Sequence, residues 1–127
     1  MKIKETIPPR VIIGDKRGAP IEISDCAHIE LFPDELVTFE TPSGTEYDVV
    51  RKSWGYYSTP SLNGRLQGFG LRAVLVKNLD AKYYIFLVEN GQEDLFEDYC
   101  DVQEVTVVCW LDNDRALKLL DAKLNSS

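Results

Sequence analysis

The spacing of apolar residues changes along this chain near residue 91. Before that point apolar and polar residues alternate, as in "IEISD" at 21–25, or apolar residues form short runs such as "LRAVLVKN" at 71–78 and "KYYIFLVEN" at 82–90. Both patterns are typical of strands. After that point, in "GQEDLFEDYCD" at 91–101, the apolar residues recur one helical turn apart. Strands first and helices last predict an α+β fold.

The first half of the chain predicts short strands and one clear hairpin. "RVIIG" at 10–14, 21–25 and "AHIELFPDE" at 27–35 each predict a strand, the last broken by a proline. The hairpin covers "LVTFETPSGTEYDVVRK" at 36–52, because Pro-Ser-Gly supplies its turn. A second hairpin joins 71–78 to 82–90.

The last third predicts a helix, a strand and a second helix. The helix over 91–101 is followed by "EVTVVCWL" at 104–111, whose nearly continuous apolar run is typical of a strand near the centre of a sheet. "DNDRALKLLDAKL" at 112–124 predicts a helix capped by Asp112 or Asn113.

We therefore expect a single domain over 1–127, with a mainly antiparallel, curved sheet of five or six strands and two C-terminal helices. On this pattern the core residues are Val37, Phe39, Tyr47, Val49, Val74, Val76, Ile85, Leu87, Leu95, Tyr99, Val107, Leu117 and Leu120, and the second helix buries Ala116, Leu117, Leu120 and Leu124. Cys100 and Cys109 fall in apolar patterns and are expected to be small buried hydrophobic residues.

Charge is unevenly distributed. The formal net charge is −7, yet residues 49–79 contain no Asp or Glu and five Lys or Arg. The overall negative charge disfavours nucleic acid as a partner, because phosphate binding needs a positive surface. The acid-free window is consistent with a surface that faces an anion, or with buried strands from which charges are excluded.

"SWGYYSTPSLNGRLQGFGLR" at 53–72 lies within this window and holds four aromatic residues, four glycines and two arginines. Its spacing does not predict a helix, and it has too many large apolar groups for a disordered segment. An ordered loop of this kind suits an anionic or polyhydroxylated small molecule, which aromatic faces, hydroxyls and guanidinium groups would hold. The candidate ligand-binding residues are Trp54, Tyr56, Tyr57, Ser58, Thr59, Asn63, Arg65 and Arg72.

Other interpretations of this segment remain open. Trp54 and Phe69 also suit core anchors, and Arg65 and Arg72 also suit ion pairs with the chain's many acids. A protein-interaction surface is a third possibility.

The candidates for catalysis are few. If the chain is an enzyme, Asp48 or His28 is the candidate base, and Cys26 would share a strand face with His28. With one histidine and three scattered cysteines, neither a metal site nor a cofactor is expected.

The expected location rests on the lack of a membrane-spanning run and of a signal-peptide pattern, and the expected assembly rests on how common homodimers are. No apolar run is long enough to span a membrane, and the first ten residues lack the apolar core of a signal peptide. We therefore expect a cytoplasmic protein without a membrane partner. A homodimer is the expected assembly, because "YYIFLV" would leave a hydrophobic sheet edge to cover.

Residues from about 20 to 115 resemble a family of small uncharacterised bacterial proteins found among surface-polysaccharide and sugar-nucleotide biosynthesis genes. The resemblance rests on "EYDVVRKSWGYYSTPSLNGRLQGFGLRAVLVKN", "KYYIFLVENG" and "VVCWLDND", most distinctively on "WGYYSTPSLNGRL". It implies this cellular context and nothing about mechanism. Together with the segment at 53–72, it leads us to expect an accessory protein of surface-glycan synthesis that binds an anionic sugar derivative, or alternatively a small enzyme acting on a sugar phosphate or nucleotide sugar. It implies no catalytic residue.

Overall fold

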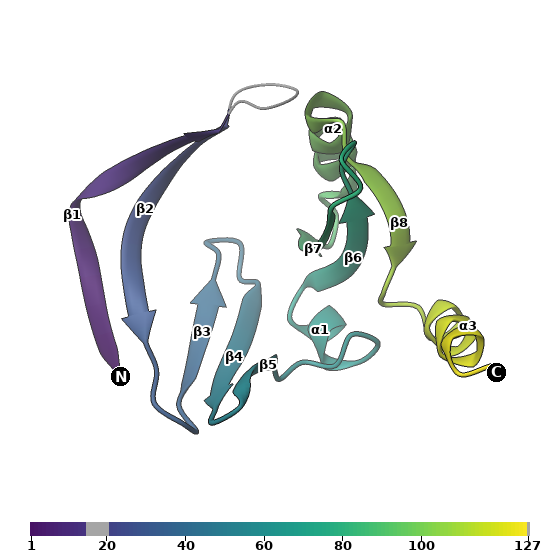
Figure 1. Cartoon of the computed structure of the whole chain (residues 1–127), viewed down its shortest axis with the longest axis horizontal. Coiled ribbons are helices and arrows are strands. Elements are labelled where there is room, and N and C mark those ends of the chain that lie inside the picture. The colour runs from purple at the N-terminus through teal and green to yellow at the C-terminus, as the bar shows by residue number, and fades with distance from the viewer. Residues whose placement is uncertain (15–20, 127) are drawn as a thin grey trace. The chain divides into compact units, whose positions relative to one another are not determined.

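The computed structural model describes residues 1–14 and 21–126 and has an α+β fold, which confirms the predicted class (Figure 1). The described part contains eight strands in three antiparallel sheets and three helices, more strands than the expected five or six. The chain divides into two compact units. The first comprises residues 1–38 and 48–59, and the second comprises 39–47 and 60–127.

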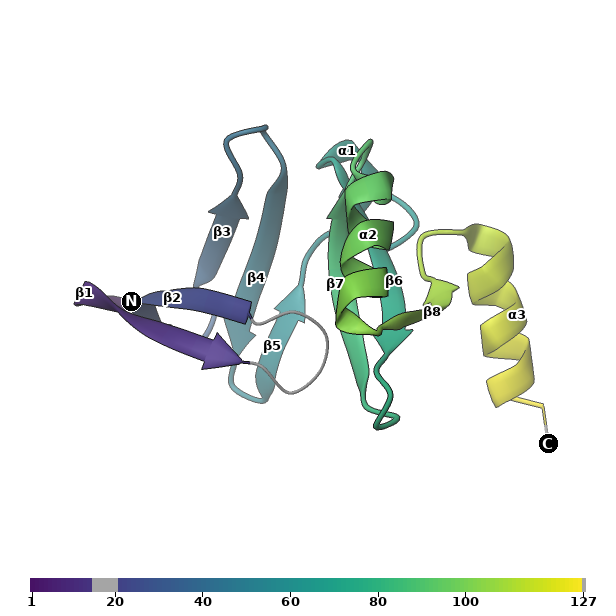
Figure 2. The same ribbon diagram turned by 90° about the horizontal axis from the view of Figure 1, so that it is seen from above.

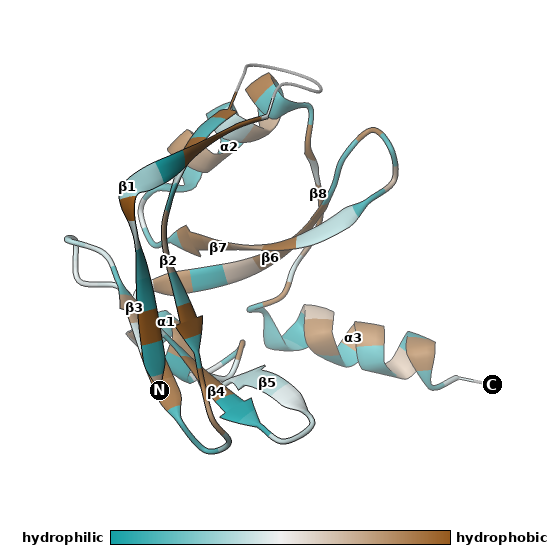
Figure 3. Ribbon diagram, turned by 60° about the vertical axis from the view of Figure 1, so that its left-hand side comes forward, coloured by the Kyte–Doolittle hydropathy of each residue, from teal (hydrophilic) through white to brown (hydrophobic). Residues whose placement is uncertain are grey.

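A long two-stranded ribbon begins the first unit. β1 (Lys2–Gly14) pairs antiparallel with β2 (Ile21–Glu30), so that Ile3 lies opposite Ile29 and Ile12 opposite Ile23. Figure 3 shows the resulting apolar stretches along both strands. The prediction of separate strands over 21–25 and 27–35 was wrong: β2 is continuous through 26, because "SDCAH" contains no glycine or proline to turn the chain.

The second sheet has the order β3-β4-β5, with β3 at Leu36–Glu40, β4 at Glu46–Lys52 and β5 at Gly55–Ser58. The predicted hairpin over 36–52 is confirmed, and its tip at 39–47 belongs to the second unit. β4 and β5 are joined by a tight turn at 53–54, because Lys52 pairs with Gly55.

The third sheet, in the second unit, has the order β7-β6-β8. β6 (Leu71–Lys77) and β7 (Tyr83–Glu89) form the predicted second hairpin, and β8 (Thr106–Trp110) pairs with the other side of β6. The prediction that β8 lies near the sheet centre was wrong. β6 is the central strand, and its alternate residues are buried on both faces of the sheet.

Two hydrophobic clusters lie on these two faces. Helix α2 (Glu93–Gln103) covers one face (Figure 2) and packs Phe96 and Cys100 against Val74, Val76 and Val88. On the other face the fully buried Leu66 packs with Leu71, Ala73 and Leu111. Leu66 comes from α1 (Arg65–Gly68), a single turn that the sequence pattern did not predict.

Helix α3 (Asp114–Leu124) begins as predicted, since the Asn113 side chain caps it by accepting a hydrogen bond from the Ala116 N–H at 3.1 Å. Its predicted buried stripe was wrong, because no residue of α3 is buried.

Of the predicted core, Val74 and Val76 are buried, and Tyr47, Leu87 and Leu117 pack partly buried at the second cluster. The predicted core residues that are instead exposed are Phe39, Ile85, Leu95, Tyr99, Val107 and Leu120.

Candidate functional site

The candidate ligand-binding residues fall in both units. Trp54, Tyr56, Tyr57, Ser58 and Thr59 belong to the first unit, and Asn63, Arg65 and Arg72 belong to the second. The segment is not one irregular loop, because it contains β5 and α1. The start of α1 had a local signal: the Ser61 hydroxyl accepts a hydrogen bond from the Arg65 N–H at 3.1 Å, four residues on.

The β4–β5 hairpin presents a stacked aromatic pair. The Trp54 and Tyr57 ring centroids lie 6.3 Å apart, and the two ring planes differ by only 21°. Trp54 is 70% exposed and Tyr57 is 46% exposed. Two large rings that stack on each other while remaining open to solvent form a flat apolar platform. The alternative interpretation of Trp54 as a core anchor was wrong, because its ring is exposed.

A fixed carboxylate lies on the same face of the hairpin. Tyr57 is opposite Val50, and Asp48 lies two residues from Val50 along β4, roughly 7 Å at the rise of a strand. The Thr38 hydroxyl donates to Oδ1 of Asp48 at 2.6 Å, and the Thr59 hydroxyl donates to Oδ2 at 3.4 Å. Asp48 is half-buried and held from both sides.

The opposite face of the same hairpin carries a cation beside a ring. The guanidinium carbon of Arg51 lies 5.7 Å from the Tyr56 ring centroid, and Tyr56 is 61% exposed. Nη1 of Arg51 is buried without a hydrogen-bond partner among the described residues. A buried donor of this kind is rare and calls for an acceptor. The neighbouring Lys52 is already paired with Asp34.

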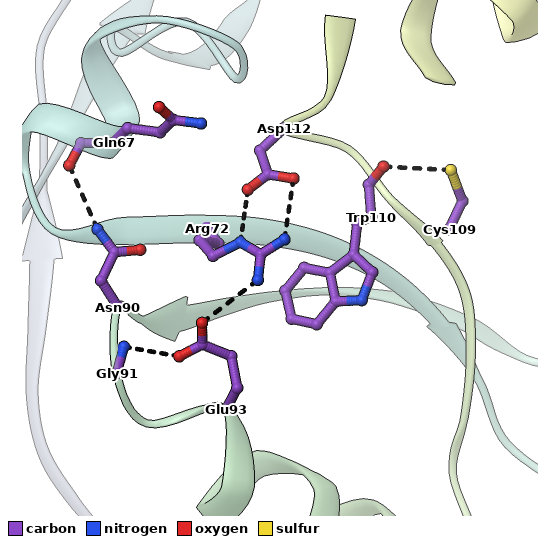
Figure 4. Close-up of polar contacts among 8 residues, drawn as sticks. All are labelled: Gln67, Arg72, Asn90, Gly91, Glu93, Cys109, Trp110 and Asp112. Atoms are coloured by element: carbon purple, nitrogen blue, oxygen red, sulfur yellow. Dashed lines mark hydrogen bonds and ion pairs between the residues drawn. The ribbon is translucent and has the colours of Figure 1, made fainter. Parts of the chain in front are cut away.

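Arg72 is fully engaged within the second unit (Figure 4). Its Nε and Nη2 donate to the two carboxylate oxygens of Asp112 at 2.6 and 3.4 Å, and Nη1 donates to Glu93 at 3.3 Å. Its guanidinium carbon lies 4.0 Å from the Trp110 ring centroid. The hydrogen bond to Asp112 above all, and then that to Glu93, raises the pKa of Arg72 despite partial burial. This geometry is that of a structural tie.

The two other candidates in the second unit are exposed. Nδ2 of Asn63 donates to Oδ1 of Asp114 at 2.6 Å. The guanidinium carbon of Arg65 lies 5.2 Å from the Phe69 ring centroid, and Arg65 forms no ion pair within the described ranges.

The other catalytic candidate is His28 on the β1–β2 ribbon. Nε2 of His28 lies 3.2 Å from Oδ2 of Asp25, which also pairs with Arg10 at 3.0 Å. Cys26 shares a strand face with His28, but its thiol donates to the Ser24 carbonyl oxygen at 3.4 Å. Both side chains are exposed, so the ribbon offers a His–Asp pair without an enclosed site.

A second polar site, around Glu89, has no signal in the sequence pattern. The hydroxyls of Ser43 and Thr45 donate to Oε1 of Glu89 at 2.8 and 3.3 Å. Hydrogen bonds from Ser43, then from Thr41, lower the pKa of Glu89. Glu89 borders a hollow of about 470 Å³, whose other walls include Phe39, Tyr47, Leu71 and Leu87. No local pattern could reveal it, because its hydrogen bonds join residues more than forty positions apart.

Over residues 1–14 and 21–126, no group of His, Cys, Asp and Glu side chains is arranged to hold a metal ion. In the same ranges, none of the helices combines the length and the apolar character that crossing a membrane requires. Comparisons with protein-family models, curated proteins and solved structures found no match to this chain.

Proposed function

We propose that this chain is a binding protein for a sugar derivative, which stacks on the platform formed by Trp54 and Tyr57. The observation that carries the proposal is the exposure of two stacked rings on one hairpin. Sugar rings have an apolar face that packs on an aromatic ring and hydroxyls that need hydrogen-bond partners at its edge. Asp48 and Thr59 lie on the platform's face of the same hairpin and supply such partners, whereas Ser58 belongs to the other face.

Arg51 lies on the opposite face of this hairpin, beside Tyr56, so a sugar stacked on the platform would meet it only through an acidic group that extends around the edge of the sheet at β5. Arg51 is the cation of β4 that has no carboxylate partner among the described residues. Arg72, which the sequence had suggested for this role, is occupied by Asp112 and Glu93. That the ligand belongs to bacterial surface-glycan synthesis, and that the protein acts in the cytoplasm, are expectations from the family resemblance and from the composition.

The test uses the chain's own fluorescence. Trp110→Phe leaves Trp54 as the sole tryptophan of the two in the chain. We would titrate this variant with neutral oligosaccharides, uronic acids, sugar phosphates and nucleotide sugars. We expect an acidic sugar to change the Trp54 emission, and Trp54→Ala or Tyr57→Ala in the wild-type background to weaken binding about tenfold, measured by calorimetry.

The matched control is Tyr83→Ala. Tyr83 is 58% exposed and belongs to β7, not to the hairpin that carries the platform, so its removal should leave sugar affinity unchanged. If no sugar binds, or if Tyr83→Ala weakens binding as much as Trp54→Ala does, the platform is not the site.

A second candidate function is an enzyme acting on the same class of sugar with Asp48 as base. The geometry that favours it is a carboxylate fixed by two hydroxyls on the platform's own face. If Asp48→Asn keeps binding but abolishes product formation, the chain is an enzyme, and loss of product in His28→Ala instead would transfer the role to His28. Binding without product supports a binding protein, and neither binding nor product favours a protein-interaction module.

A further inference from the structure

β7 is an edge strand whose outer side is open. Its seven residues, Tyr83–Glu89, all pair with β6 on one side, from Leu71 opposite Glu89 to Lys77 opposite Tyr83. In the described part of the chain no strand pairs with its other side. An open edge presents unpaired N–H and C=O groups, and proteins usually cover such an edge or use it to bind an extended segment.

An apolar hollow follows this edge. It has a volume of about 610 Å³, and five consecutive residues of β7, 85–89, line it together with Gln92, Leu95, Phe96 and Tyr99 beside or on α2. Consecutive strand residues point to opposite faces of the sheet, so a hollow lined by all five runs along the strand rather than over one face. Leu95 is 65% exposed and Ile85 is 56% exposed, which leaves apolar surface to be covered.

Acidic residues of α2 lie next to residues that line the hollow. Helix α2 carries five acids and no base, and its Asp94 and Asp98 lie one turn apart, next to Leu95. Neither carboxylate forms an ion pair within 1–14 and 21–126. Glu93, by contrast, is already held by Arg72.

We propose that the β7 edge and the adjoining hollow bind an extended, basic segment of a partner protein, in which apolar residues alternate with Lys or Arg. The partner's backbone would pair with β7, its apolar side chains would fill the hollow, and its cations would meet Asp94 and Asp98. This surface lies wholly in the second unit and shares no residue with the sugar platform.

Charge favours such a partner over a second copy of this chain. Two copies that paired along β7 about a two-fold axis would place their α2 helices next to each other on one face of the joined sheet. Each helix carries five acids, so like charges would meet where the basic segment supplies opposite ones.

The probe for this proposal is an eight-residue peptide that alternates valine with lysine and has blocked ends. Two controls accompany it: the same length alternating valine with glutamate, and the lysine peptide methylated on alternate backbone nitrogens. We expect the lysine peptide to bind, shifting the amide resonances of Tyr83–Glu89 and slowing their hydrogen exchange, and both controls to fail. Equal binding of the glutamate peptide or of the methylated peptide would overturn the proposal.

Two charge reversals on one helix localise the contact. Asp98→Lys should weaken lysine-peptide binding about fivefold at low salt. Glu97→Lys makes the same change two residues from both Leu95 and Tyr99, hence away from the hollow, and should have little effect. Equal losses would show that only the overall charge of the protein matters. A dimer in sedimentation that Leu95→Asp dissociates would assign the edge to a second copy instead.

Discussion

Nε of Arg72 lies 2.6 Å from Oδ2 of Asp112, whose side chain is only 6% exposed. Arg72 comes from the central strand β6, and Asp112 follows the edge strand β8, forty residues later in the chain. A carboxylate this buried needs a charged partner, and the planar guanidinium supplies two donors to it. The pair therefore ties β6 to the segment that leads into α3.

Arg72→Lys should destabilise the protein. Lysine cannot make the two-pronged contact, so Asp112 keeps at most one charged donor, and we expect the free energy of unfolding to fall by about 2 kcal/mol. Urea denaturation followed by circular dichroism measures this. Arg65→Lys is the matched control, because Arg65 is exposed, its guanidinium lies over the Phe69 ring, and it forms no ion pair among the described residues. A neutral Arg72→Lys would contradict the assignment of a structural tie.

The sequence predicted the structural features that depend on residues close together in the chain. Both hairpins, the helix from Glu93 and the cap at Asn113 follow from local spacing and turn chemistry, and all are present. The position of β8 at an edge could not be predicted, since a strand's number of partners is decided by the rest of the sheet. The role of Arg72 depends on Asp112 and Glu93. Both lie far from residue 72 in the chain, so the strand pattern around it carries no information about them.

The candidate site was predictable in part for the same reason. Trp54 and Tyr57 are three residues apart in the chain, and the turn at 53–54 brings their rings together. Their stacking is therefore a local property of the segment. The hydroxyls that fix Asp48 come from β3 and from the end of β5, which only the folded sheet brings together. The apolar residues that α2 exposes had the spacing of a core face, and spacing alone cannot distinguish a core from a docking surface.

Ser43→Ala should raise the pKa of Glu89, because the Ser43 hydroxyl is the main cause of its lowering. A carboxyl whose pKa is lower in the folded state stabilises the fold above its unfolded pKa, about 4.3, and this contribution is lost as the pH falls through the folded value. The variant should therefore lose it at a higher pH than the wild type. Carbon-13 NMR titration of the Glu89 carboxyl measures the shift. The exposed Ser53→Ala is the control, and an unchanged Glu89 titration in Ser43→Ala would contradict the assignment.

Gly70→Ala should cost more stability than Gly44→Ala. Both residues have positive φ, +85° and +98°, so alanine strains the backbone at each by about 1 kcal/mol. At residue 70 a new Cβ would also lie 3.0 Å from Cγ2 of Thr45, whereas at residue 44 it meets nothing within 4 Å. Thr45→Ser in the Gly70→Ala background should recover the difference, measured by urea unfolding. Equal losses in the two single variants would show that Thr45 moves aside freely.

The three cysteines should react with iodoacetamide at clearly different rates. Cys26 is exposed, Cys109 is half-buried, and Cys100 is buried in the cluster with Val76 and Phe96. Only the thiolate reacts, and burial, reinforced by Asp101 and Glu97, raises the pKa of Cys100. Cys100 therefore has a smaller thiolate fraction, and the reagent has little access to its buried thiol. It should be modified only when α2 opens from the sheet. Mass spectrometry of peptides after timed labelling should give the order Cys26, Cys109, Cys100, and denaturant should remove the differences. Rapid modification of Cys100 in the native protein would mean that α2 does not stay packed on β6 and β7.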